Sequence, residues 1–347
     1  MDDIKFSAVS EDELTKVIGG LKEHFKEITV HEEDSHDYLG MIMMHDVKDQ
    51  MVTIDMRKYI SECVDKFQDQ EPDEKIKTVN TPATDNLFKT RNAEKISKRR
   101  SKISHSTVAK LLFVAKRARP DILLTVSFLT TRVKEADGDD WKKLLCLLGY
   151  LKSTDGLLLH LSCTDLMNLI WYIDGSYATH DDMRRQSGAV LLAGDCAVLF
   201  RSNKQKVNTR SSTESELIAV DDALPTVQWT KNFMMDQGFD LETLIKEDNR
   251  STMLLMKNGK LSSGKWTKHI DVRYFYVKDL IDQGIIKLEH CVTDDMIADF
   301  LTKPLQRKCF VRLRDVMLNY VSSVEHRCVL ENNLWFRMRY QYERDTE

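Results

Sequence analysis

The sequence has few of the features that mark secreted or membrane proteins. Its seven cysteines are widely spaced and include no C-x-x-C pair, which argues against a zinc ribbon and a disulfide framework. No apolar run approaches the roughly 18 residues that a membrane span needs. The N-terminus, M-D-D-I-K, has no signal-peptide layout. We therefore expect an intracellular protein with no membrane contact.

An excess of charge of one sign is also lacking. The formal net charge is -4 with 31% charged residues, so a nucleic-acid partner would have to bind local basic clusters rather than a global positive field. Apolar residues make up 42% of the 347 positions, which is enough for most of the chain to fold. The length is typical of two to three domains.

Residues 1–68 predict a small α+β unit. Apolar positions recur at helical spacing over residues 11–25, with Ser10 as the N-cap. A hairpin is expected with strands at residues 38–44 and 51–56, followed by a short helix at residues 59–67.

The next two segments differ sharply in polarity. Residues 69–104 are polar and predict a linker or a loosely packed arm. This segment holds a basic run that is either a solvated surface or a phosphate-contacting strip, made of Lys95, Lys98, Arg99, Arg100 and Lys102. Residues 105–155 predict a connector of three short helices, the first of which ends at Arg119-Pro120.

The pattern changes after Gly156. Residues 156–303 read as strands and then as strands alternating with helices, which predicts an α/β (α+β) fold, a mixed sheet flanked by helices. The expected strands are residues 157–161, 169–173, 189–192, 197–200, 244–247 and 285–291. The expected helices are residues 212–235, 251–257, 269–281 and 293–301. Residues 304–347 are expected to form a peripheral C-terminal tail.

Four carboxylates stand at the ends of these elements. Asp174 closes the buried strand L-I-W-Y-I-D, and Asp248 follows a short strand. Glu216 lies in the first turns of the long helix, with Glu214 as its rival, and Asp299 lies on the last helix. Taken singly, each acid is a helix cap or a surface charge. Taken together they would raise one another's pKa values unless a cation balanced them.

Mg²⁺ suits such a group because it prefers oxygen ligands, and Mn²⁺ would serve in its place. Two such ions about 3.5–4 Å apart support phosphodiester hydrolysis. A basic patch before the long helix is either a phosphate-binding surface or a solvated loop, and comprises Arg201, Lys204, Lys206 and Arg210. Lys268 is a further candidate for nucleic-acid binding, and His269 for substrate positioning or proton transfer. Trp171, Tyr172 and Trp229 are expected in the core rather than as stacking platforms.

Five blocks of sequence resemble the ribonuclease H domain of copia-type retrotransposon Pol polyproteins. They are Y-I-D-G-S-Y-A, S-N-K-Q-K-V-N-T-R-S-S-T-E-S-E-L-I-A, E-D-N-R-S, T-K-H-I-D-V-R-Y-F-Y-V and M-I-A-D-F-L-T-K-P-L. The run H-S-T-V-A-K-L-L-F-V-A-K-R-A-R-P-D-I resembles the segment that joins polymerase to ribonuclease H in these polyproteins. Residues 1–58 resemble the end of the reverse-transcriptase palm, where Asp2 and Asp3 match the tail of its Tyr-x-Asp-Asp turn.

The resemblance implies a ribonuclease H-like domain at residues 156–303, preceded by a helical thumb or connection segment and a truncated palm remnant at residues 1–68. It implies that Asp174, Glu216, Asp248 and Asp299 hold two Mg²⁺ ions that cut the RNA strand of RNA–DNA hybrids. Hybrid choice would then depend on shape and the 2′-hydroxyl group. The implied location is the cytoplasm, in a virus-like particle, or the nucleus.

The sequence departs from the family pattern in two places, and each departure bears on activity. The fingers and the rest of the palm would precede Met1, so Asp2 and Asp3 are expected to be vestigial and the chain alone is not expected to synthesise DNA. The missing N-terminal part of the polyprotein would then be a partner. Arg250 stands near Asp248 where the family more often has an amide. This cation motivates the main alternative, a catalytically inactive remnant that at most binds nucleic acid.

Overall fold

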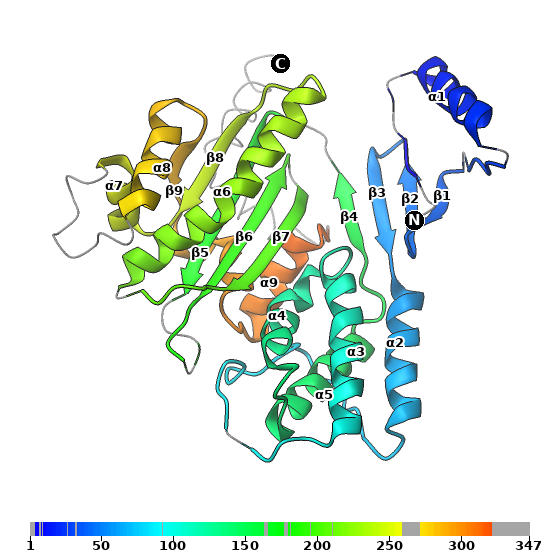
Figure 1. The fold of residues 1–347 in the computed structure, drawn as a ribbon, viewed down its shortest axis with the longest axis vertical. Coiled ribbons are helices and arrows are strands. Elements are labelled where there is room, and N and C mark those ends of the chain that lie inside the picture. Colours follow the sequence, from blue (N-terminus) through cyan, green and yellow to red (C-terminus); the bar gives the residue numbers. More distant parts are fainter. Residues whose placement is uncertain are drawn as a thin grey trace, which may run out of the picture.

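Figure 1 shows the fold of the chain in a computed structural model. The structure describes residues 4–6, 8, 10–25, 27–31, 33–91, 93–162, 166–176, 180, 182–194, 196–209, 211–258 and 271–320, with backbone alone for 271–275. Two sheets organise these residues, one with the strand order β1-β2-β3-β4 and one with the order β7-β6-β5-β8-β9. Helices lie between and around the two sheets (Figure 1).

The four-stranded sheet is antiparallel and is formed by β1 (Ser35–Tyr38), β2 (Met41–Asp46), β3 (Met51–Asp55) and β4 (Leu159–Ser162). The sequence predicted one strand over residues 38–44. Leu39 and Gly40 both have positive φ, 53° and 74°, and they turn the chain into two strands instead. Ahead of the sheet lies α1 (Glu11–His24), which begins at Ser10 as predicted, because the Ser10 side chain accepts the N–H of Glu13.

A helical layer follows, made of α2 (Arg57–Gln70), α3 (Lys98–Ala115), η1 (Pro120–Ile122), α4 (Leu123–Arg132) and α5 (Gly138–Ser153). The three helices expected after residue 104 are present, although α3 begins earlier, at Lys98. The expectation of a loosely packed arm was wrong in part, because Leu87 and Phe88 are buried in the core of this layer. The basic run is partly neutralised within the chain, since Arg99 and Arg100 both pair with Glu71.

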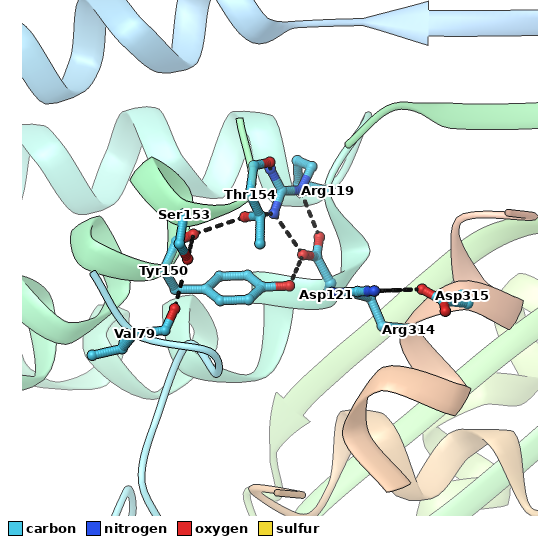
Figure 2. A network of polar contacts seen from close by, with 8 residues as sticks. All are labelled: Val79, Arg119, Asp121, Tyr150, Ser153, Thr154, Arg314 and Asp315. Atoms are coloured by element: carbon cyan, nitrogen blue, oxygen red, sulfur yellow. Dashed lines mark hydrogen bonds and ion pairs between the residues drawn. The ribbon is translucent and has the colours of Figure 1, made fainter. Parts of the chain in front are cut away.

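A buried polar network fixes the turn between α3 and α4 (Figure 2). The guanidinium of Arg119 donates to both carboxylate oxygens of Asp121, at 2.9 and 2.7 Å, and to the carbonyl and hydroxyl oxygens of Thr154. The hydroxyl of Tyr150 donates to Asp121 at 2.7 Å. Both charges of this pair are buried, so the network is stabilising only because each carboxylate oxygen has a partner.

The second sheet has five strands and is mixed. Its members are β5 (Asn168–Ser176), β6 (Gln186–Ala193), β7 (Cys196–Lys204), β8 (Glu242–Glu247) and β9 (Lys287–His290). β5, β6 and β7 pair in antiparallel fashion, while β8 pairs parallel to β5 and β9 parallel to β8. The predicted fold class, a mixed sheet flanked by helices, is therefore confirmed.

Both faces of this sheet are covered (Figure 1). Side chains alternate along β5, so Trp171 and Tyr172 belong to different cores. Trp171 packs under the helices α6 (Ser212–Asp236), α7 (Arg250–Asn258) and α8 (Asp271–Asp282). Tyr172 faces the other core, which holds α4, η4 (Ile297–Leu301) and α9 (Arg307–Met317). The continuous apolar run of β5 follows from this double burial.

Three expectations about individual elements need correction. The helix expected at residues 293–301 is instead two short turns, η3 (Thr293–Asp295) and η4, interrupted by an extended Met296. The strand expected at residues 157–161 is β4, which pairs with β3 rather than with the five-stranded sheet. Trp229 is 59% exposed and stacks on Phe233 along the outer face of α6, so it is not a core residue. Among the described helices, none is both long and apolar enough to cross a membrane.

Candidate metal centre

Two aspartates meet because their strands are parallel neighbours. Tyr172 of β5 pairs with Lys246 of β8, so Asp174 and Asp248, each two residues further along, are at the same level of the sheet. The first turns of α6 bring Glu216 to this edge. One carboxylate oxygen from each of Asp174, Glu216 and Asp248 lies within 4.8 Å of the other two. We call these three residues the acidic trio.

Small groups after Asp174 let α6 approach the strand closely. The N–H of Gly175 donates to Oε2 of Glu216 at 2.5 Å, and the hydroxyl of Ser215 donates to the carbonyl oxygens of Gly175 and Ser176. A Cβ atom on Gly175 would lie 2.5 Å from the carbonyl oxygen of Ser215. Glycine is therefore required where the helix start meets β5, and this contact orients the Glu216 carboxylate.

Asp299 reaches the same edge from η4, on the other face of the sheet. The ammonium of Lys303 lies 2.6 Å from Oδ1 of Asp299 and 3.8 Å from Oδ1 of Asp174. The hydroxyl of Thr302 donates to Oδ2 of Asp174. Gly188 of β6 pairs with Asp174 of β5, and a Cβ atom on Gly188 would lie 2.9 Å from the carbonyl oxygen of Ala298. This close packing fixes η4, and with it Asp299, beside the trio.

The carboxylates sit in an environment that disfavours their charge. Burial raises the pKa of Asp174 to about 6, with smaller contributions from Asp299 and Asp248, while Lys303 opposes the rise. Burial, and then repulsion from Asp174 and Glu247, hold the pKa of Glu216 well above its usual range. Burial also raises the pKa of Asp299. A divalent cation would relieve this conflict, and the donor set, made of oxygens alone, suits Mg²⁺ or Mn²⁺.

Glu247 is a fifth acid at this edge, and its position was not anticipated. It is fully buried at the end of β8, and its Oε1 accepts the N–H of Asn249. No hydrogen-bond donor among the described residues reaches its Oε2. Burial holds its pKa well above the usual range. Strand alternation would have revealed it, because Glu247 shares a face with the buried Ile245.

Lys303 and Thr302 were also overlooked, although both stand in the block M-I-A-D-F-L-T-K-P-L. The spacing of Asp299 and Lys303, four residues apart, indicates an ion pair on one side of a helical segment. Glu214 is buried beside the helix start but is not one of the acidic trio, whereas Glu216 is. Arg250 is exposed, and its Nε lies 3.5 Å from Nε2 of His290 rather than on the Asp248 carboxylate.

The predicted phosphate-binding residues have different surroundings. Arg201 donates to the carbonyl oxygen of Asp222 and to the hydroxyl of Thr226, and Lys204 pairs with Asp182 at 2.7 Å. Lys206 is exposed on the loop that follows β7. Five predicted site residues lie outside the part of the chain that the structure describes: Asp2, Asp3, Arg210, Lys268 and His269.

Two solved ribonuclease H structures match part of the chain at low sequence identity. LC11-RNase H1, isolated from compost, matches 39% of this chain and 92% of its own with 16% identity and a TM-score of 0.31. The same enzyme in complex with an RNA/DNA hybrid matches with 13% identity, 39% and 94% coverage, and a TM-score of 0.30. No protein-family model matches the chain.

Sequence relatives are more informative. The Retrovirus-related Pol polyprotein from transposon TNT 1-94 of Nicotiana tabacum is 27% identical over 293 residues, which are 80% of this chain and 21% of that polyprotein. The corresponding polyprotein from transposon RE2 of Arabidopsis thaliana is 30% identical over 195 residues, 55% of this chain and 13% of its own length. Secreted RxLR effector protein 161 of Plasmopara viticola is 30% identical over 126 residues, 36% of this chain and 88% of the effector.

The chain thus spans about a fifth or less of the Pol polyproteins that it matches, at 21% and 13% of their lengths. Over 55–80% of its length the chain is similar to copia-type retrotransposon Pol polyproteins, and its mixed five-stranded sheet carries the acidic trio at one edge.

Proposed function

We propose that the chain is a ribonuclease that hydrolyses the RNA strand of RNA–DNA hybrids with two divalent cations. The observation that carries this proposal is the acidic trio, three carboxylates from β5, β8 and α6 whose oxygens lie within 4.8 Å of one another. The sequence similarity to Pol polyproteins supports it, because the five sequence blocks that resemble a ribonuclease H domain include all three of these residues. The nuclease domain would comprise residues 156–303.

Each acid would have a distinct part in holding the cations. Asp174 and Asp248 would provide the central ligands, and Glu216 and Asp299 would complete the set. The bound cations would supply a hydroxide nucleophile and stabilise the leaving oxygen. The chain itself orients these ligands in advance: Gly175 holds Glu216, and Thr302 holds Asp174. Such preorganisation is what transition-state stabilisation requires.

The hybrid would be held by its backbone and its shape, since a ribonuclease of this kind distinguishes RNA by the 2′-hydroxyl group. Lys206 is exposed and would contact phosphates directly. Arg201 and Lys204 already have partners on α6 and at Asp182, so a phosphate would have to displace these contacts. Arg210, Lys268 and His269 complete the proposed binding and positioning set.

The test is cleavage of a labelled RNA–DNA hybrid by the full chain at increasing Mg²⁺ concentration, with duplex DNA as the negative substrate. We expect Asp248→Asn to lower kcat by on the order of 10³-fold, roughly 4 kcal/mol of transition-state stabilisation. Asp240→Asn is the matched control, because Asp240 is an exposed carboxylate just before β8. Wild-type kcat in the Asp248→Asn variant, or cation-independent cleavage, would refute the proposal.

A further inference from the structure

Among the described residues, one ammonium contacts the acids at this edge directly. The Nζ atom of Lys303 lies 2.6 Å from Oδ1 of Asp299 and 3.8 Å from Oδ1 of Asp174, so it bridges the two carboxylates. The side chain is 40% exposed, while those of Asp174 and Asp299 are 3% and 15% exposed. Lys303 therefore approaches one buried and one partly buried acid from the solvent side.

The four proposed ligands are consequently not equivalent. Asp174, Glu216 and Asp248 form a compact group whose oxygens already lie together. Asp299 is outside that group, and one of its oxygens is engaged by an ammonium at 2.6 Å. A charge-assisted hydrogen bond of this length is strong. A divalent cation bound between Asp174 and Asp299 would need oxygens of the same two carboxylates at about 2.0–2.1 Å.

We propose that Lys303 is a built-in competitor of the second cation. The acidic trio takes the first cation with Lys303 in place, and the second cation binds between Asp174 and Asp299 only when Lys303 moves outward. Lys303 is thus a positioning residue that sets the affinity of the second metal site. This inference rests on the proposed two-cation function, and it assigns to Lys303 a role distinct from that of the ligands.

A purely structural role for Lys303 predicts something else. Its pairing with Asp299, four residues earlier, would then only stabilise the short helix η4. Removing the ammonium would lower stability and leave the affinities for both cations unchanged. The two roles are therefore separated by metal affinity, and activity is not needed to distinguish them.

The experiment is a Mn²⁺ titration of the full chain, with free Mn²⁺ followed by electron paramagnetic resonance. Wild-type protein is expected to bind one ion tightly and a second more weakly. Lys303→Gln should strengthen Mn²⁺ binding at the second site by at least about tenfold. An opposite charge within about 4–6 Å shifts the pKa of a carboxyl group by about one to three units, and competition for a cation should be of the same order. Lys303→Arg keeps the charge and should leave the second site weak. Asp299→Asn should weaken the second site and spare the first.

A second measurement follows Lys303 itself in the wild-type chain by NMR. Reductive ¹³C-methylation labels every lysine, and the Lys303→Arg variant identifies the Lys303 resonance. During a Mg²⁺ titration, that resonance should move with the second equivalent and not with the first. Equal second-site affinities in wild type and Lys303→Gln, or a Lys303 resonance unmoved at saturation, would overturn the inference while leaving the acidic trio intact. A wild-type chain that binds no cation at all would overturn the proposed function as well.

Discussion

Without divalent cations, the free energy of unfolding should fall as the pH rises, because buried acids must then ionise in the folded protein. The Asp174→Asn substitution should remove the part of this fall that Asp174 causes. Burial raises the pKa of Asp174 from 3.8 to about 6. The folded chain therefore holds this proton more tightly than the unfolded chain does. The stabilisation is fully present below about pH 4 and is lost as the pH rises through about 6.

The magnitude follows from the size of the shift. A change of about two units, at 1.36 kcal/mol for each unit, corresponds to about 3 kcal/mol of unfolding free energy. The pKa values of Glu216 and Asp299 are also raised, so they add to the fall in the same direction. Asparagine at position 174 cannot ionise, and the free energy of unfolding of the variant should decline less steeply over the same pH range.

The assay is urea unfolding followed by tryptophan fluorescence, in chelator, at several values between about pH 4 and pH 7.5. Asp182→Asn is the control, because Asp182 is half-exposed and its pKa is lowered by hydrogen bonds from Lys204 and Arg184 despite partial burial. Saturating Mg²⁺ should restore the stability of the wild type at high pH by binding the folded state. Parallel pH profiles for wild type and Asp174→Asn in chelator would refute the reasoning.

Three further substitutions test the packing around the site and the helical layer. Gly175→Ala should lower the melting temperature, because its Cβ would lie 2.5 Å from a backbone oxygen, whereas Gly156→Ala, with nothing within 4 Å, should not. Tyr150→Phe should cost about 1–3 kcal/mol in urea unfolding, because buried Asp121 loses a hydrogen-bond donor (Figure 2). Glu247→Gln should raise the melting temperature in chelator at alkaline pH, because burial penalises the ionised form of Glu247 and glutamine cannot ionise; a decrease, measured by circular dichroism, would contradict this explanation.

Much of the site could be predicted because its geometry follows from regular elements. Asp174 and Asp248 were predicted to lie at one edge on the condition that their strands are neighbours, and β5 and β8 do pair in parallel. Glu216 follows from the amphipathic start of α6, whose Leu217 and Val220 are buried. The proposal that these residues hold metal remains a prediction, as do the domain boundaries.

The remaining features depend on contacts that local patterns do not specify. Asp299 was predicted as a site residue, but it lies on a short 3₁₀ segment rather than on the expected helix, and such a segment has no helical periodicity to show where its side chain points. The pairing of β4 with β3 joins residues about a hundred positions apart, and strand alternation does not select a partner. Trp229 was placed in the core on residue type alone, whereas α6 buries Val227 and turns Trp229 outward.

The helical layer and one face of the five-stranded sheet share a single apolar core. Leu111 and Leu148 from the helices belong to the same cluster as Val190 from β6 and Phe300 from η4. The hydroxyl of Ser127 on α4 also donates to the carbonyl of Ser202 on β7. The sheet edge that carries the acidic trio thus depends for its rigidity on the helical layer as well as on its own strands. Trimming the chain to the five-stranded sheet would expose this apolar face to water, and substitutions within residues 105–155 would loosen the edge that holds the trio.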